Sequence, residues 1–387
     1  MTPDAYYHRL ISGRQRGPVA SLLRGGLTLL SWPYGAVVGI RNAYYDRTDR
    51  GVRRASAPVI SVGNLVAGGT GKTPMVIWIL QRLAELGRRP AVLMRGYGAG
   101  ARGCCQANQA LQDAIHGCEN DEAREIRRRC PRADLLIDPD RVAGADKAAA
   151  MGCDVLVMDD GFQHRRLGRD LDIVLIDATD PFSAGLLPRG MRREPVGSLV
   201  RAGVVVVTRA DQATGEVLQT LRQQVTRLAP DAPVLAARHR PIELCDQSGR
   251  CDADMRVDAM AGRRAWVFAG LGNPTAFIAT VEGMGFEVTG RQFYPDHHTC
   301  SDAELDEMAS QVAQAGADVV LTTEKDAVKL PPDRPDWPAP LRVVRVGIEF
   351  LGGDAETMSR LIDRAVSADG APIDRKDVPD DQALSTD

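Results

Sequence analysis

The stretch SVGNLVAGGTGKTP, residues 61–74, is the most informative segment of this chain. An apolar run, PVISV, leads into it, and the amphipathic stretch PMVIWILQRLAELG continues from its end, which is typical of a strand, a turn and a helix. Pro74 suits the first helical turn, and Gly87 suits the position just past the helix end. Backbone N–H groups of a glycine-rich turn and the dipole of the following helix bind phosphate. The stretch therefore predicts a nucleotide site.

The end of this turn carries the residues of a triphosphate site. Lys72 is expected to neutralise charge on the β- and γ-phosphates, and the Thr73 hydroxyl is expected to reach Mg²⁺. Val66 stands where the strict G-x-x-x-x-G-K-T pattern has its first glycine, and a chance glycine-rich turn is the alternative. The strand before, the helix after and the GKT ending favour a P-loop. Its expected nucleotide contacts are Asn64, Ala67, Gly68, Gly69, Thr70, Gly71, Lys72 and Thr73.

A second motif ends the apolar run of DVLVMDDGFQH, residues 154–164. Carboxylates at the end of a strand downstream of a P-loop commonly hold the metal ion, so Asp159 and Asp160 predict a Mg²⁺ site. A solvated turn that happens to contain two acids is the alternative. Gln163 and His164 follow directly, where they would touch phosphate or sugar unless they only cap the turn that leaves the strand.

From Pro58 onward, short apolar runs alternate with amphipathic stretches, a pattern that predicts a parallel sheet covered by helices. We expect an α/β fold of the P-loop NTPase type, with a mostly parallel sheet flanked by helices and a second, smaller α/β domain. The expected units are an apolar N-terminal segment (1–55), a nucleotide-binding domain (56–240), the smaller domain (241–364) and a disordered polar tail (365–387).

The N-terminal segment contains the apolar run LTLLSWPYGAVVGI, residues 27–40, with arginines on both sides. The run spans about 14 residues and contains Pro33, whereas a helix that crosses a bilayer needs roughly 20 apolar residues. Trp32 and Tyr34, together with the basic flanks, favour a helix that lies in a membrane interface. A helix packed on the main domain is the alternative.

Charge and cysteine content exclude several classes of protein. Lys and Arg number 48 against 51 Asp and Glu, and a formal charge of -3 provides no general field for a nucleic acid backbone. Nucleic acid is therefore not an expected partner. The eight cysteines include no C-x-x-C pair, and Cys118, Cys130 and His116 match no zinc-ligand spacing. Reduced thiols in a cytoplasm are the simpler interpretation.

Five segments, in this order and at these intervals, resemble the tetraacyldisaccharide 4'-kinase (lipid A 4'-kinase) family: VGNLVAGGTGKTP, DDGFQHRRLGRDLDIVLID, LLPRGMRREP, PDHH and TEKDAVKL. The resemblance extends from the apolar N-terminal segment to about Phe350. It implies that the γ-phosphate of ATP is transferred, with Mg²⁺, to the 4'-hydroxyl of an acylated glucosamine disaccharide 1-phosphate, the lipid A precursor. It also implies a location at the cytoplasmic face of the bacterial inner membrane.

The resemblance assigns roles where the motifs match. Arg193 and Glu194 match the arginine and the acid of the LLPRG-x-x-REP block, which implies a clamp on the phosphates for Arg193 and a part in metal binding for Glu194. Together with Lys72, Thr73 and the two acids of the DDGFQH motif, these residues form the expected phosphoryl-transfer site.

Two further motif matches imply which residues lie at the acceptor hydroxyl. Family members carry a G-D-E-P motif whose aspartate lies at the acceptor hydroxyl, and its nearest match is Asp121, although Asn120 and Ala123 replace the glycine and proline. His297 matches the family's D-H dipeptide in the second domain, where it would close over the first and orient or charge-balance Asp121. A surface-loop histidine is the alternative. As a general base, Asp121 would accelerate transfer by about 10²–10⁴-fold.

Two other functions compete with this interpretation. VVVVTRAD, residues 204–211, imitates the strand and T-K-x-D element with which regulatory GTPases read guanine, but Arg209 replaces the lysine. Met158 also stands where such proteins place the aspartate of D-x-x-G. A nucleotide-binding scaffold that docks on membranes is the second alternative, and it would tolerate the loss of Asp121 and His297.

Overall fold

The computed structural model describes residues 3–48, 51–96, 121–251, 260–270, 274–295, 298–331 and 337–367. Within these ranges the strands form one sheet in the order β3-β2-β4-β1-β5-β6-β7-β11-β10-β8-β9. The strands are β1 (Val59–Asn64), β2 (Pro90–Met94), β3 (Asp134–Ile137), β4 (Val155–Asp159), β5 (Leu171–Asp177), β6 (Val204–Thr208), β7 (Val234–Cys245), β8 (Arg264–Gly270), β9 (Glu287–Tyr294), β10 (Val319–Thr323) and β11 (Leu341–Phe350).

Helices cover both faces of the sheet. They are α1 (Pro3–Ile11), α2 (Pro18–Arg47), α3 (Lys72–Glu85), α5 (Asp121–Arg129), α6 (Arg141–Ala150), α7 (Gly215–Leu228), α9 (Pro274–Gly283), α10 (Asp302–Ala315), α11 (Glu324–Ala327) and α12 (Asp354–Val366). Short 3₁₀ turns lie at Val196–Arg201 and Ala210–Gln212. The described strands pair in parallel except β7 with β11, which are antiparallel. The expected α/β class with a mostly parallel sheet is what the structure shows.

Strands β1 to β6, with the helices that cover them, form the first body, which has the layered architecture of a nucleotide-binding domain. Strands β1, β4 and β5 are buried along their whole length, because helices pack on both faces and leave no strand side chain in water. Helices α3, α5 and α12 share one core with the sheet, and α6 and α7 pack on cores of the other face. The carboxyl ends of β1 and β4, where ligands of such sheets bind, therefore lie side by side.

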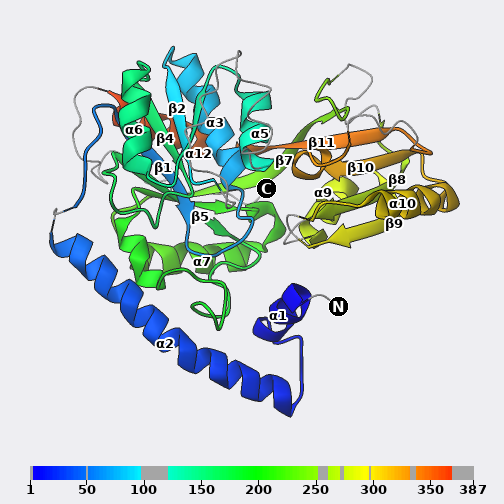
Figure 1. The fold of residues 1–387 in the computed structure, drawn as a ribbon, viewed down its shortest axis with the longest axis horizontal. Coiled ribbons are helices and arrows are strands. Elements are labelled where there is room, and N and C mark those ends of the chain that lie inside the picture. Colours follow the sequence, from blue (N-terminus) through cyan, green and yellow to red (C-terminus); the bar gives the residue numbers. More distant parts are fainter. Residues whose placement is uncertain are drawn as a thin grey trace.

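The second body is smaller and is joined to the first by a ribbon. In Figure 1 the long strands β7 and β11 run from one body to the other, and β10, β8 and β9 continue the sheet beyond them. The boundary expected at residue 240 falls inside β7. The expected unit 241–364 also differs at its end, because α12 returns to the first body, where Ile362 shares a core with Ile60.

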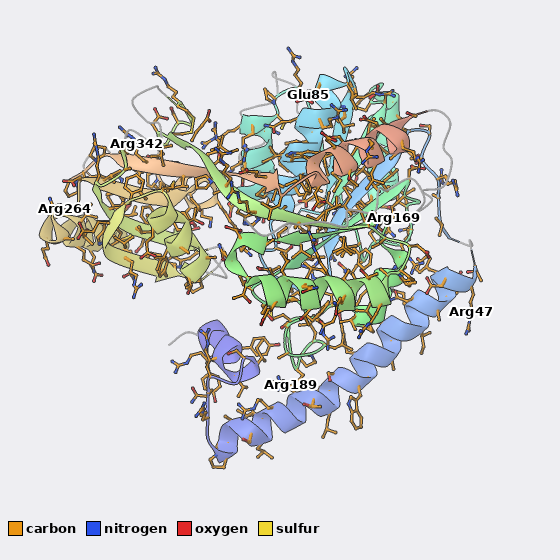
Figure 2. The ribbon with its side chains drawn as sticks, turned by 180° about the vertical axis from the view of Figure 1, so that it is seen from behind. Arg47, Glu85, Arg169, Arg189, Arg264 and Arg342 are labelled. Carbon is orange, nitrogen blue, oxygen red and sulfur yellow. A yellow bond between two sulfur atoms is a disulfide. The ribbon has the colours of Figure 1, made fainter. Side chains whose placement is uncertain are left out.

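Helix α2 is much longer than the apolar run that predicted it. It spans 30 residues, including Pro33, and lies along the outside of the molecule in Figure 1. Arg189, labelled in Figure 2, donates a hydrogen bond of 3.1 Å to the carbonyl oxygen of Ile11, the last residue of α1. This bond connects α1 to the first body. No helix in the described part of the chain is long and apolar enough to cross a membrane.

Candidate active site

The P-loop connects β1 to α3 and is held in shape from within. Gly71, the residue before α3, has a φ of 89°, a conformation that favours glycine. The Asn64 side-chain amide donates to the Thr70 hydroxyl at 2.8 Å, and the Thr208 hydroxyl donates to the Thr70 carbonyl oxygen at 3.0 Å. The turn is therefore fixed before any phosphate arrives, which leaves its exposed glycines for binding.

The second motif lies against β1 because two glycines leave room for it. A Cβ atom on Gly161 would come within 2.6 Å of the Ser61 hydroxyl, and one on Gly63 would come within 2.5 Å of the Phe162 Cβ. The backbone of the DDGF segment thus crosses directly over the first strand. This close packing explains why glycine follows the two acids, and it brings Asp160 to the P-loop.

Two cations converge on Asp160. One guanidinium nitrogen of Arg193 lies 2.7 and 2.8 Å from the two carboxylate oxygens, and the Lys72 ammonium lies 3.5 Å from one of them. Burial alone would raise the pKa of Asp160, but Lys72 and Arg193 hold that pKa below its ordinary value. The backbone N–H of Arg193 donates to the Leu65 carbonyl oxygen at 2.7 Å, and this bond fixes the position of Arg193 beside β1.

Asp159 is the acid without a cation of its own. Its side chain is buried, and its Oδ1 atom has no hydrogen-bond partner among the described residues. Burial raises the pKa of Asp159 to about 6, and the nearby charges of Asp160 and Glu122 add to the shift while Lys72 opposes it. An orphaned, buried carboxylate oxygen beside a phosphate loop fits a hard divalent cation such as Mg²⁺.

Gln163 and His164, expected together at the phosphates, point to different surroundings. The Gln163 amide donates to the Asn64 carbonyl oxygen at 2.9 Å, and its oxygen accepts from Arg193 at 3.3 Å. His164 lies among arginines instead, and its carbonyl oxygen accepts from Arg169. Burial, together with the charges of Arg141, Arg169 and Arg166, lowers the pKa of His164 to about 4, so its ring is neutral at pH 7. The structure therefore brings only Gln163 to the P-loop.

Glu194 is turned away from the acids, against the expectation of a metal ligand. It is fully buried, and its two oxygens accept hydrogen bonds from Arg41 at 2.7 Å, Arg201 at 2.8 Å and Asn42 at 3.0 Å. Burial alone would raise the pKa of this carboxyl, but Arg201 and the other donors hold it below its ordinary value. Arg193 therefore reaches Asp160, whereas Glu194 anchors α2.

Asp121 begins α5 and has a partner that sequence reasoning missed. The Lys329 ammonium, from the second body, lies 3.3 Å from its carboxylate, and the two side chains are 8% and 16% exposed. The charge of the next residue, Glu122, contributes to the raised pKa of Asp159, which places the start of α5 near the acid pair. Lys329 stands in the TEKDAVKL segment, but no spacing rule joins it to Asp121. His297 lies outside the described residues.

Comparison with known proteins decides the family. A family model described as tetraacyldisaccharide-1-P 4'-kinase matches residues 23–367. The chain belongs to this family. A tetraacyldisaccharide 4'-kinase of Anaeromyxobacter dehalogenans strain 2CP-C is 42% identical over 347 residues, which cover 87% of this chain and 89% of the relative. One from Syntrophus aciditrophicus is 39% identical over 334 residues, covering 82% and 86%.

A solved structure agrees with the sequence relatives. The crystal structure of LpxK from Aquifex aeolicus in complex with ATP matches with a TM-score of 0.67 and 26% identity, covering 89% of this chain and 100% of that one. These comparisons confirm the family, the P-loop type of fold and the ATP-dependent kinase activity expected from the sequence. The regulatory GTPase and the scaffold are not favoured.

The two bodies of this kinase meet along α5 and α11. Besides the pair at Asp121, the Lys325 ammonium lies 3.9 Å from the Glu122 carboxylate, and Arg129 lies 3.5 Å from Glu324. The Arg129 and Glu324 side chains are only 5% and 9% exposed, so removing one partner would leave the other charge buried and unpaired. The interface between the two bodies is therefore polar.

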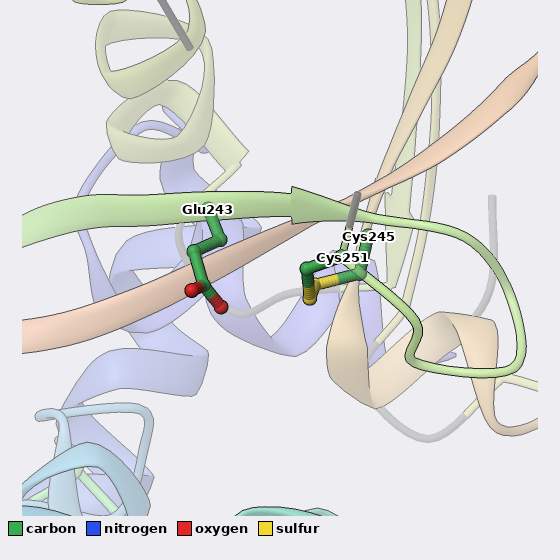
Figure 3. Close-up of side chains that lie close together, drawn as sticks. All are labelled: Glu243, Cys245 and Cys251. Atoms are coloured by element: carbon green, nitrogen blue, oxygen red, sulfur yellow. A yellow bond between two sulfur atoms is a disulfide. The ribbon is translucent and has the colours of Figure 1, made fainter. Parts of the chain in front are cut away.

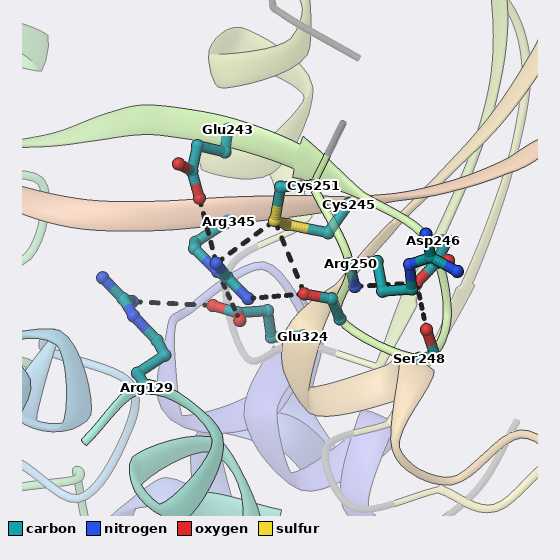
Figure 4. Close-up of a disulfide and its surroundings, with 10 residues drawn as sticks. Arg129, Glu243, Cys245, Asp246, Ser248, Arg250, Cys251, Glu324 and Arg345 are labelled. Atoms are coloured by element: carbon teal, nitrogen blue, oxygen red, sulfur yellow. Dashed lines mark hydrogen bonds and ion pairs between the residues drawn. A yellow bond between two sulfur atoms is a disulfide. The ribbon is translucent and has the colours of Figure 1, made fainter. Parts of the chain in front are cut away.

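Among the described residues outside the P-loop, one group of side chains resembles a metal centre. Figure 3 shows Glu243, Cys245 and Cys251 close together, but the two sulfurs are bonded to each other. The expectation of reduced thiols therefore does not hold for this pair. In Figure 4 the Arg345 guanidinium fills the space between them, 2.9 Å from Glu243 and 3.2 Å from the Cys251 sulfur. Because a cation already occupies this position, we assign no metal site there.

Proposed function

We propose that this chain transfers the γ-phosphoryl group of ATP to the 4'-hydroxyl of tetraacyldisaccharide 1-phosphate while docked on a membrane surface. The observation that carries the proposal is the convergence of Lys72 and Arg193 on Asp160 at the end of the P-loop. Lys72 and Arg193, which share one carboxylate, can turn to the oxygens of a triphosphate. Phosphoryl transfer depends mainly on such positioning and charge stabilisation.

Each side chain then has a defined task. Lys72 and Arg193 stabilise the charge that spreads over the γ-phosphate oxygens as the bond to the leaving diphosphate lengthens. Thr73, Asp159 and Asp160 are the residues that would hold Mg²⁺. The ion, when bound, neutralises charge on the β- and γ-phosphate oxygens.

On the acceptor side, Asp121 accepts the proton of the 4'-hydroxyl as its oxygen bonds to phosphorus. The ion pair with Lys329 supports this role, because it holds the carboxylate in place where the second body meets the first. We place His297 at the same acceptor site through the family's D-H dipeptide. Closure of the two bodies over the lipid would exclude water and limit hydrolysis of ATP.

The membrane part of the proposal rests on the outer face of α2. Eight apolar side chains of this helix are at least 50% exposed: Val19, Leu22, Leu29, Leu30, Trp32, Val37, Ile40 and Tyr44. An exposed apolar stripe of this length is unusual for a protein surrounded by water. The opposite face joins the active site, because the Tyr34 hydroxyl donates to the Arg193 carbonyl oxygen at 2.9 Å. The helix would thus hold the site beside lipid at the cytoplasmic face of the inner membrane.

A transfer assay tests the proposal. The full-length protein in mixed micelles, given radiolabelled ATP, Mg²⁺ and tetraacyldisaccharide 1-phosphate, should produce lipid labelled at the 4'-position, and GTP should replace ATP poorly. Asp121→Asn should lower kcat by about 10²–10⁴-fold, because the amide cannot accept the proton, while ATP binding is unchanged. A wild-type protein that binds ATP but labels no lipid would contradict the proposed reaction.

A further inference from the structure

The segment 186–195, which carries the LLPRG-x-x-REP block, lies against the start of the P-loop. The Ala67 N–H donates to the Met191 carbonyl oxygen at 2.7 Å, and the Arg193 N–H donates to the Leu65 carbonyl oxygen at the same distance. The backbone of this block is therefore bonded to the loop that binds phosphate.

The same block is also packed against the N-terminal helices. The Tyr7 hydroxyl of α1 donates to the Pro188 carbonyl oxygen at 2.7 Å. Gly35 of α2 lies so close to the block that a Cβ atom on it would come within 3.1 Å of the Leu186 Cδ1. The block thus connects α1 and α2 to the phosphate loop.

Three side chains of α2 hold the end of the block. The Tyr34 hydroxyl donates to the Arg193 carbonyl oxygen at 2.9 Å, and burial raises the pKa of Tyr34, so this donor keeps its proton at neutral pH. Arg41 and Asn42 donate to the carboxylate of the next residue, Glu194, at 2.7 and 3.0 Å. Residues seven or eight positions apart lie on one face of a helix. The inner face of α2 therefore grips two consecutive residues of the block.

Arg193 is the point where these contacts reach the chemistry. Its N–H is bonded to Leu65, its carbonyl oxygen to Tyr34, and its guanidinium to Asp160. The first two bonds fix the backbone from which the long side chain extends. Because phosphoryl transfer depends on the placement of cations around the γ-phosphate, a shift of this backbone would misplace a group that the reaction needs.

We infer that Tyr34 is a positioning residue for phosphoryl transfer, whose hydroxyl holds the Arg193 backbone so that the guanidinium meets the γ-phosphate. Helix α2 is then a working part of the active site in addition to being the membrane contact. The inference rests on the proposed function in one respect, namely that Arg193 stabilises the phosphoryl group during transfer.

Tyr34→Phe tests this role, because it keeps the ring and removes only the hydroxyl. In the full-length protein without lipid or nucleotide, the peptide that carries Arg193 should exchange its amide protons with deuterium about threefold to tenfold faster, the effect of one lost hydrogen bond. In the mixed-micelle transfer assay, kcat should fall by a similar factor. The KM for lipid and the flotation with vesicles should not change, because the outer face of α2 is intact.

A double-mutant cycle shows whether Tyr34 acts through Arg193. In an Arg193→Ala background, Tyr34→Phe should cause no further loss of kcat, because the group that it positions is gone. Arg41→Met removes the neighbouring contact of the same face and replaces Tyr34→Phe in the cycle if the latter does not fold.

Tyr45→Phe is the matched control, since it makes the same substitution on the same helix. The Arg165 guanidinium lies 5.4 Å from the centre of the Tyr45 ring, and the phenylalanine ring keeps that contact. Both amide exchange and kcat should equal those of the wild type.

Equal losses of kcat from Tyr34→Phe with and without Arg193 would overturn the inference, because Tyr34 would then support the fold as a whole. Unchanged amide exchange or unchanged kcat would overturn it as well. A raised KM for lipid at an unchanged kcat would assign Tyr34 to the membrane face instead. The exchange measurement contains no lipid, so its result is independent of the transfer reaction. A wild-type protein that labels lipid normally, with a Tyr34→Phe variant that does the same, would refute the positioning role alone.

Discussion

The Lys329 ammonium of the second body lies 3.3 Å from the carboxylate of Asp121 in the first. Lys329 is itself held by Asp326, also at 3.3 Å, and Asp326 accepts hydrogen bonds from the Gly270 N–H at 3.0 Å and the Thr323 hydroxyl at 2.7 Å. The position of this cation is thus built into the fold of the second body. The charge next to the proposed base therefore depends on how the two bodies sit together.

Lys329→Met is expected to lower kcat by about tenfold or more and to leave the Kd for ATP unchanged, because the variant removes a contact of the acceptor side only. Lys325→Met is the matched control, since Lys325 also bridges the bodies but pairs with Glu122 at 3.9 Å. In the double variant with Asp121→Asn, the two losses should not add. Steady-state kinetics of the single and double variants measure this. Equal effects of the two lysine changes would indicate a general role in the interface instead.

Glu194 offers a test between metal binding and structure. Glu194→Gln should lower the free energy of unfolding by about 3 kcal/mol, because it leaves Arg201, whose side chain is 11% exposed, without its charge partner. The Mg²⁺ concentration needed for half-maximal activity should stay the same. Glu243→Gln changes a carboxylate that is 47% exposed, and Arg345 keeps Glu324 as a partner, so the variant should cost less than about 1 kcal/mol. Urea unfolding and a magnesium titration measure the two effects, and a large rise in the magnesium requirement would restore Glu194 as a ligand.

Local pattern predicted the parts of the site that are close in sequence. The strand, turn and helix around Lys72 follow from apolar periodicity and glycine placement. The same is true of the two acids that end β4. The P-loop NTPase type of fold could be predicted as well, because βα repetition leaves few alternatives.

Pairs that are distant in sequence could not be predicted. Nothing in the spacing of Arg41 and Glu194 says that one partners the other, and the LLPRG-x-x-REP block equally allowed Glu194 to face the metal. The contact between Lys329 and Asp121 also arises only when the second body folds against the first. The division at residue 240 lies within β7, which continues through both bodies although the segment RHRP, residues 238–241, interrupts its buried residues.

Substitutions on the exposed apolar face of α2 should weaken membrane binding without changing ATP binding. Replacing Leu22, Trp32 and Ile40, which are 78%, 68% and 72% exposed, by serine should reduce binding to anionic vesicles at least tenfold. Each side chain that enters the interface contributes about 1 kcal/mol or more. ATP affinity and thermal stability should not change. Val217→Ser, on an exposed apolar residue of α7, is the control for vesicle flotation. If the triple variant still floats with vesicles, another surface makes the contact.

We expect the buried Asp159 carboxylate to lower the stability of the folded protein near neutral pH. Burial raises its pKa from an ordinary 3.8 to about 6, so the folded state holds this proton more tightly than the unfolded chain does. As the pH rises from about 4 to 6, the unfolded carboxyl therefore ionises first, and the folded protein loses stability. Above pH 6 the loss is complete, and two units correspond to about 3 kcal/mol as an upper limit.

Asp159→Asn removes this titration, so the variant without ligand should match the wild type near pH 4 and exceed its free energy of unfolding at pH 7. It should also lose kinase activity and most of the thermal stabilisation that Mg²⁺ adds in the presence of ATP, because the orphaned oxygen is no longer charged. Asp146→Asn changes a carboxylate that is 65% exposed and should shift neither curve. Chemical unfolding between pH 4 and 8 measures the effect. A variant that is less stable than the wild type at pH 7 would mean that the Asp159 carboxylate is already compensated in the folded protein, and a full response to Mg²⁺ would remove Asp159 from the metal site.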